Sequence, residues 1–286
     1  GNYILKVFDN SNPTQTIITK RFCVVEQKVP IDAKVRIMVQ SGYFYNDQEL
    51  EALLDFSGTE LYNPSQNTKL VLLKNYNWNE TVVISKPDMI RENELSYTNY
   101  NLLKFKGGNE FHHLNIKGIE YNVDNIVNID FIDNMYHFLL APNTDRTFDK
   151  YIFEPDINGR FKIDVNQRTD PATEADYSYV YFTLKMDIPL QTGDIFVWGA
   201  LTNYEFSNEN KMTYNFEEKA YECRLLLKQG YYDYQYVLID NNKIDYTYIE
   251  GNHTQTDNDY TILVYYKDIR GNYDRLIGVS EISSNK

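Results

Sequence analysis

The chain has 286 residues, and 41 acidic against 28 basic residues give it a formal net charge of −13. This charge repels nucleic-acid phosphates and anionic lipid surfaces at long range, so no nucleic-acid partner is expected. No apolar run approaches the roughly 20 residues that cross a bilayer as a helix, so the chain is not expected to span a membrane. Its 26 Tyr and 15 Phe are typical of β-rich proteins.

The first 27 residues predict a β-hairpin. The alternating segments NYILKVF (2–8) and TIITKRFCVV (16–25) are separated by the turn-rich DNSNPTQ. A lone hairpin is marginal in water, because two strands bury little apolar surface. We therefore expect residues 1–27 to be the C-terminal hairpin of a first β-domain whose front part is absent.

Residues 28–168 carry short candidate strands and are expected to form a middle β-sandwich domain. Within them, Asn158-Gly159 predicts a hairpin turn, because both residues tolerate positive φ angles. The segment NDQELEALLDFSG (46–58) fits a capped helix as well as a strand. We predict a strand there, because its neighbours are all strands.

Residues 169–286 are expected to form a C-terminal immunoglobulin-like, early-set-like sandwich, entered through the polar linker 168–176. In YSYVYFTLKM (177–186) the apolar residues at even positions face one way, and Tyr177, Tyr179 and Tyr181 face the other. In the later strand 231–238, Tyr232, Tyr234, Tyr236 and Leu238 share one face, and their spacing leaves open whether that face is buried. The fold class predicted for the whole chain is all-β, with tandem antiparallel β-sandwich domains.

The sequence holds no motif of a readable enzyme class, such as Gly-x-Ser-x-Gly, a phosphate loop or His-Glu-x-x-His. His112 and His113 are neighbours that point to opposite faces of a strand, so they cannot chelate one ion together. Carboxylates are numerous enough for a glycosidase-like pair, but nothing in their spacing brings two together. Cys23 and Cys223 are expected to be separate free thiols. We predict no catalytic, cofactor-binding or metal-binding residue, and no enzyme activity.

Several short motifs lie in a fixed order along the chain. They are Gly107-Gly-Asn-Glu-Phe111, Trp198-Gly199, Asn210-Lys211-Met212, Tyr221, Lys228-Gln-Gly-Tyr231 and Ile249-Glu-Gly251. Together they resemble the type IX secretion system plug protein family of the Bacteroidetes, with His112 where we expect Arg. The resemblance covers nearly the whole chain. It implies a non-catalytic periplasmic protein, peripheral to the outer membrane, that binds and blocks the translocon channel.

A second resemblance points to a different function. Trp198-Gly199 followed by a loop and a Gly-Tyr-Tyr strand pair is similar in outline to early-set modules that bind starch or glycogen. Those modules place exposed aromatic rings over glucose, which makes Trp198 and Tyr204 the residues of interest. Trp198, within the apolar run DIFVWGAL (194–201), is equally compatible with a place in the core. Exposed rings can also anchor a protein partner. For either partner the candidate binding residues are Tyr177, Tyr179, Tyr181, Trp198, Tyr204, Lys211 and Tyr231.

Overall fold

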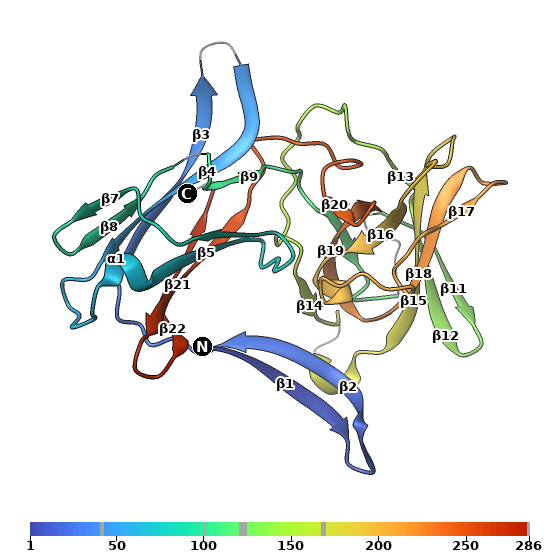
Figure 1. Cartoon of the computed structure of the whole chain (residues 1–286). Coiled ribbons are helices and arrows are strands. Elements are labelled where there is room, and N and C mark those ends of the chain that lie inside the picture. Colours follow the sequence, from blue (N-terminus) through green and yellow to red (C-terminus); the bar gives the residue numbers. More distant parts are fainter. Residues whose placement is uncertain (41–42, 100, 120–124, 167–169, 285–286) are drawn as a thin grey trace. The chain divides into compact units, whose positions relative to one another are not determined.

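The computed structural model describes residues 1–40, 43–99, 101–119, 125–166 and 170–284. These residues form a nearly all-β protein, which confirms the expected all-β, sandwich-type fold (Figure 1). The helical turns in this part of the chain are short: α1 (Pro64–Asn67), α2 (Pro171–Glu174) and the 3-10 turn η1 (Ala200–Thr202). In the described ranges, no helix is long and apolar enough to cross a membrane.

The chain divides into two compact units at positions other than those predicted. Unit 1 comprises Gly1–Phe105 and Asn258–Lys286, and unit 2 comprises Lys106–Asp257. The predicted boundary between residues 168 and 169 therefore falls inside unit 2, and the last strands belong to unit 1. The cause is pairing between distant segments: β21 (Asp259–Asp268) runs antiparallel to β5 (Thr68–Lys74). Alternation within a strand reveals its faces but not its partner.

Unit 1 is a sandwich of two sheets with a hairpin attached. Its five-stranded sheet has the order β3-β4-β8-β7, with β9 also pairing with β4, and its four-stranded sheet has the order β22-β21-β5-β6. The remaining bounds are β3 (Ile31–Gln40), β4 (Tyr43–Asp55), β6 (Thr81–Ile84), β7 (Met89–Arg91), β8 (Glu94–Tyr97), β9 (Lys104–Lys106) and β22 (Tyr273–Ser283). Leu54, Leu72 and Ile262 are among the buried residues that fill the space between the two sheets. The ambiguous segment 46–58 lies mainly in β4, as predicted.

The predicted N-terminal hairpin is present as β1 (Asn2–Asp9) and β2 (Asn12–Cys23). Almost every residue of both strands is exposed. The base of the hairpin is fastened to the rest of unit 1, because the Tyr265 hydroxyl donates to the Asn2 side chain at 2.5 Å and the Arg21 guanidinium lies 4.5 Å from the centre of the Trp78 ring. The hairpin is therefore held at one end, without a covered face.

Unit 2 is a sandwich of a five-stranded and a six-stranded sheet. The five-stranded sheet centres on β19 (Gly230–Asp240), which pairs with β10 (His112–Asn115), β14 (Phe161–Ile163), β16 (Asp194–Trp198) and β20 (Lys243–Asp245). The six-stranded sheet has the order β11-β12-β15-β18-β17, with β13 also pairing with β15. Its strands are β11 (Ile126–Ile132), β12 (Met135–Leu140), β13 (Asn143–Thr144), β15 (Tyr177–Lys185), β17 (Thr213–Asn215) and β18 (Ala220–Lys228). Because β12 and β13 run parallel to β15, this sheet is not purely antiparallel.

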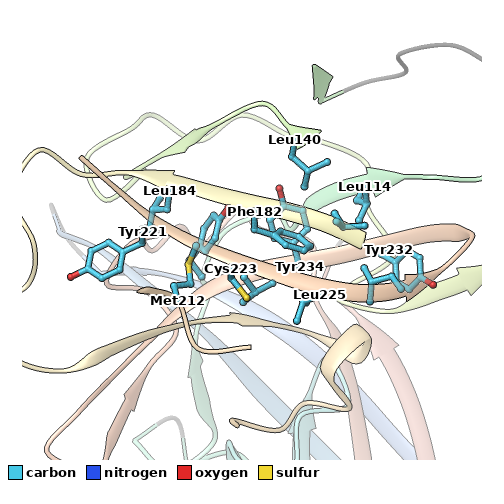
Figure 2. Close-up of a cluster of buried hydrophobic side chains, with 14 of the residues drawn as sticks. Leu114, Leu140, Phe182, Leu184, Met212, Tyr221, Cys223, Leu225, Tyr232 and Tyr234 are labelled. Atoms are coloured by element: carbon cyan, nitrogen blue, oxygen red, sulfur yellow. The ribbon is translucent and has the colours of Figure 1, made fainter. Parts of the chain in front are cut away.

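The tyrosines of β19 lie inside unit 2. Tyr232, Tyr234 and Tyr236 are at most 3% exposed and belong to the main hydrophobic cluster between the two sheets (Figure 2). Phe182 of β15 meets the Tyr234 ring edge to face, with 4.9 Å between ring centres. The hydroxyls of Tyr234 and Tyr236 both have a hydrogen-bond partner, since they donate to the half-buried Asn143 side-chain oxygen at 2.9 and 2.8 Å. Burying rings whose hydroxyls are satisfied avoids the cost of unpaired polar groups.

The predicted Asn158-Gly159 turn has the expected backbone but a different role. Both φ angles are positive, 55° and 76°, and a Cβ atom on Gly159 would lie 2.6 Å from the Phe111 ring. No strand precedes the turn, so it does not close a hairpin. Instead the Asp233 carboxylate accepts the backbone N–H groups of Ile157 and Gly159 at 2.6 and 3.2 Å, which attaches the turn to β19.

Cys23 and Cys223 are free thiols, as predicted, and they lie in different units. Cys223 is buried among the apolar side chains of unit 2, and that burial raises the pKa of its thiol to about 12. A thiol with so high a pKa carries almost no thiolate at neutral pH and is inert as a nucleophile.

A buried carboxylate, Glu250, joins the segments of unit 2. Its side chain is completely buried and pairs with the Arg146 guanidinium, whose Nε donates to it at 2.8 Å. It also accepts the Tyr236 backbone N–H at 2.7 Å, and the His112 Nε2 atom lies 3.2 Å away. Burial opposes its charged form, but these groups together outweigh burial and lower the pKa of Glu250 to about 2.

Replacing Glu250 tests this ion pair. We expect Glu250→Gln to lower the free energy of unfolding by about 3–5 kcal/mol at pH 7, because the buried Arg146 loses its counter-charge. Since the folded-state pKa of Glu250 is lowered, its stabilisation is complete above about pH 4.5 and is lost as the pH falls towards 2. Urea unfolding followed by circular dichroism measures the effect. Glu222→Gln, at a half-buried carboxylate on β18, is the control; equal midpoints for the two variants would contradict the expectation.

Glu110 is a second buried carboxylate of unit 2, and its pKa is shifted in the opposite direction. It is 1% exposed, and burial raises its pKa to about 7 against the hydrogen bonds from Tyr151 and the Asp257 N–H. A raised folded-state pKa means that the folded protein loses stability as the pH rises from about 4.5 to 7. Glu110→Gln should therefore stabilise the protein by about 1–3 kcal/mol at pH 8 and not at pH 4. Melting temperatures at both pH values measure this, with the exposed Glu154→Gln as control. A gain of the same size at both pH values would refute it.

Candidate functional site

The candidate site is the face of the six-stranded sheet that points away from the core of unit 2. On β15, the side chains at 178, 180, 182 and 184 are buried and the alternate ones are not. This is the alternation that the sequence predicts. The solvent-facing side chains, here called the outer face, are His137 and Leu139 on β12, Tyr177, Tyr179, Tyr181, Thr183 and Lys185 on β15, Glu222, Arg224, Leu226 and Lys228 on β18, and Thr213 and Asn215 on β17.

Strand register arranges the outer face in rows across the sheet. Tyr179 lies between His137 and Leu226, and the next row places Tyr181 between Leu139 and Arg224. Directly opposed side chains in a sheet lie about 5 Å apart, and successive rows on one face about 7 Å apart. The outer face therefore brings side chains from four strands within reach of one ligand or partner.

Aromatic and cationic groups interlock at the centre of the outer face. The Arg224 guanidinium lies 4.4 Å from the centre of the Tyr179 ring, in cation–π geometry. On the other strand, the His137 ring lies 5.2 Å from the Tyr179 ring and 5.8 Å from the Tyr181 ring. The His137 Nδ1 atom is also hydrogen-bonded to the Tyr181 hydroxyl at 2.9 Å. These contacts hold the rings in one arrangement before any partner arrives.

The seven predicted binding residues do not form one site. Tyr177, Tyr179 and Tyr181 share the outer face, and Tyr177 is 57% exposed. The other four lie elsewhere in unit 2. Tyr231 stacks on His113 with 5.9 Å between ring centres, on the opposite side of β19 from the core tyrosines. Lys211 pairs with Asp194 at 2.7 Å beside β16.

The structure contradicts the prediction for Trp198, whereas Tyr204 is half-buried. Trp198 is 2% exposed and lies in a small apolar cluster with Phe111 and Val237, against which Tyr204 packs. Its ring meets Tyr204 edge to face, with 5.2 Å between centres. A ring this buried has no surface for a sugar or a protein. The Trp-Gly motif is thus a packing feature, because β16 is covered on both sides.

His137, Arg224, Leu226 and Glu222 are outer-face residues that the sequence did not single out. His137 stands alone in MYHFLLA, where no neighbour marks it. Arg224 and Leu226 belong to AYECRLLLK, whose run of three leucines hides the alternation. In residues 221–224, polar and less polar side chains alternate, and this alternation could have indicated two faces. Only the pairing of β18 with β15 shows that Glu222 and Arg224 lie on the same face as Tyr179 and Tyr181.

A metal site on the outer face would require several ligating side chains close together. Within the described ranges, no group of three or more His, Cys, Asp or Glu side chains is placed to hold a metal ion. The outer face offers rings, one apolar side chain on each flank and a few charges, an arrangement suited to binding. Fold and site together define a two-unit, all-β protein with a preorganised aromatic sheet face.

No family model matches the sequence, and no curated protein does. A hypothetical protein from Parabacteroides merdae, known from a crystal structure at 2.30 Å resolution, has the same fold with a TM-score of 0.93. The two sequences are 35% identical, and the alignment covers 99% of this chain and 72% of that one. The chain therefore belongs to the same family as the Parabacteroides merdae protein.

Two substitutions test the division of the predicted residues into core and surface. Trp198→Ala should lower the free energy of unfolding by about 3–5 kcal/mol, because it leaves a cavity in a closed aromatic cluster. Tyr177→Ala should change it by no more than about 0.5 kcal/mol, because the ring is largely exposed. Urea unfolding monitored by circular dichroism compares them. A larger loss for Tyr177→Ala than for Trp198→Ala would reverse the assignment.

Proposed function

We propose that this protein is a non-catalytic periplasmic binding protein, peripheral to the outer membrane, that plugs the translocation channel of a type IX secretion system. The motifs that resemble the plug family support this proposal. Two of them meet in the interior of unit 2, where the Asn109 amide donates to the Glu250 backbone oxygen at 2.7 Å and the Gly108 N–H donates to the Asn252 side chain at 2.9 Å. The relative from Parabacteroides, a member of the Bacteroidetes, is consistent with the group in which that family occurs.

The observation that carries the proposal is the exposed aromatic part of the outer face. Tyr177 and Leu226 are 57% and 50% exposed and sit beside Tyr179, with Lys228 at the edge. Tyrosines with fixed rings contribute large contact areas to protein interfaces at little entropic cost. A plug that must be released needs a standard-size, partly polar interface rather than an extensive apolar one. This face has that composition.

His112, where the resemblance leads us to expect Arg, lies beside the buried Glu250 carboxylate. Its Nε2 atom lies 3.2 Å from the Glu250 carboxylate, and its ring stacks on Tyr234 with 5.2 Å between centres. The departure from the expected residue therefore leaves a cation-capable side chain beside the same buried carboxylate.

The starch-module alternative has less support. It placed glucose rings on Trp198 and Tyr204, and the Trp198 ring is enclosed by its own cluster. The Tyr204 ring packs against Trp198 rather than standing free. No other observation favours an α-glucan at these positions, so the plug remains the better explanation.

A gene deletion tests the plug directly. In the native host, the deletion should make the outer membrane permeable to large antibiotics such as vancomycin and lower their inhibitory concentration at least about tenfold. Complementation with the double variant Tyr177→Asp/Leu226→Asp should fail, because two charges enter the proposed interface. Val83→Asp, which also replaces an exposed apolar side chain but lies in unit 1, is the matched control and should complement.

Co-purification provides the second readout. The wild-type protein and Val83→Asp should be recovered with an outer-membrane barrel from native membranes, and the double variant should be recovered at least about tenfold less, which corresponds to about 1.4 kcal/mol. Unchanged antibiotic sensitivity in the deletion strain would refute the plug. Full complementation by the double variant would instead show that this face is not the docking surface.

A further inference from the structure

A groove of about 820 Å³ lies over the outer face, next to the aromatic part proposed for docking. Its floor is formed by β15 and β18, one wall by the region from β11 to β13, and the other by β17. The lining includes Leu139, Tyr181, Thr183, Glu222, Arg224 and Asn215. A volume of this size suits a small ligand of a few rings. All of the lining residues belong to unit 2.

The floor of the groove presents the side chains of two paired strands. All nine residues of β15 are in register with β18, from Tyr177 opposite Lys228 to Lys185 opposite Ala220. An extended peptide lying on such a face would leave its own N–H and C=O groups without a strand edge to pair with. A ligand whose polar groups all lie at its periphery, as the hydroxyls of a sugar do, can be satisfied by side chains alone.

The two sides of the groove differ in polarity. Val127, Leu139 and Pro142 make an apolar wall, while Thr213 and Asn215 make a polar one opposite. Between them lies the Tyr181 ring, held by the hydrogen bond between its hydroxyl and the His137 Nδ1 atom. A fixed aromatic ring beside apolar and hydrogen-bonding walls matches a pyranose, which has a C–H face and a rim of hydroxyls.

The charged side chains of the groove indicate which class of sugar it is suited to bind. Lys185 lies 3.4 Å from Glu218, so these two charges offset each other. The Glu222 carboxylate accepts a hydrogen bond from the Asn215 amide at 3.1 Å and retains capacity for more. The Arg224 guanidinium contacts the Tyr179 ring, and among the described residues no carboxylate forms an ion pair with it. An unpaired guanidinium at the floor of a groove is suited to a carboxylate from a ligand.

We propose that this groove binds a short acidic oligosaccharide, one that contains a hexuronic acid. The pyranose ring lies on Tyr181, the uronate carboxylate pairs with Arg224, and a ring hydroxyl donates to Glu222. Tyr181 and Arg224 are directly opposed across the sheet, so one sugar unit reaches both. The site is independent of the channel-plugging role, because that role rests on Tyr177 and Leu226.

Calorimetry on the whole chain tests the ligand class. Trisaccharides of galacturonic, glucuronic and mannuronic acid are titrated, and maltotriose serves as the neutral control. At least one uronate should bind at least about tenfold more tightly than maltotriose, and the difference should shrink as salt is added. Failure of all three uronates to bind at millimolar concentration overturns the proposal, and equal affinity for maltotriose overturns the role of Arg224.

Variants on one strand locate the site. Arg224→Gln and Tyr181→Ala should each weaken uronate binding at least about tenfold. Leu226→Ala, on the same face of β18 but outside the groove lining, is the matched control and should bind as the wild type does. Melting temperatures of the variants verify folding. If a folded Arg224→Gln protein binds the uronate as the wild type does, Arg224 does not bind the carboxylate of the ligand and the proposal fails.

Two further variants separate this inference from the plug. The docking variant Tyr177→Ala/Leu226→Ala, which places no new charge beside Arg224, should bind the uronate normally and complement poorly. Glu222→Ala, which alters the groove without removing a contact to Tyr179, should weaken uronate binding and complement the deletion strain. Loss of both activities in either variant would mean that the outer face is one site with one partner, which overturns the independence of the groove.

Discussion

Unit 2 depends on the burial of one charge. The Glu250 carboxylate is completely enclosed, and a carboxylate in that position costs several kcal/mol unless it is paired. Arg146, His112 and the Tyr236 N–H supply the compensation, and they come from three different parts of the chain. The charge therefore requires these segments to meet at one point. A polar centre of this kind specifies one arrangement of the loops, because few alternatives satisfy it.

The consequence is a rigid platform for the outer face. The core tyrosines of β19 pack against the inner side of β15, where Tyr234 lies beside Phe182 (Figure 2). The hydroxyls of Tyr234 and Tyr236 both donate to the Asn143 side chain. With the inner side fixed, the outer side presents Tyr179, Tyr181 and His137 in one arrangement. Preorganised rings bind with less loss of side-chain freedom than mobile ones. The proposed docking of a protein partner at one end of the face and the proposed binding of a small ligand in the groove both rest on this rigidity.

Much of the local structure follows from the two-residue repeat of side chains along a strand and from the residue types that turns prefer. The spacing of Tyr232, Tyr234 and Tyr236 predicted one shared face, and the alternation in β15 predicted that Tyr177 to Tyr181 point away from the core. The same reasoning named Trp198 as a binding candidate without deciding between core and surface, because a Trp at the end of a strand is compatible with either side of a sheet. It also could not find Arg224, since its strand is apolar on both faces around Leu225 to Leu227.

The sequence by itself determined that the chain is all-β and that its strands have two distinct faces. The tertiary structure decided which strands pair and therefore which residues meet. Tyr260 opposes Lys74, and Tyr181 lies between Leu139 and Arg224. Side-chain period is a property of a single strand, whereas the choice of partner depends on burial summed over segments far apart in the chain. For that reason the faces of the strands could be derived from the sequence, but the two-unit division and the groove could not.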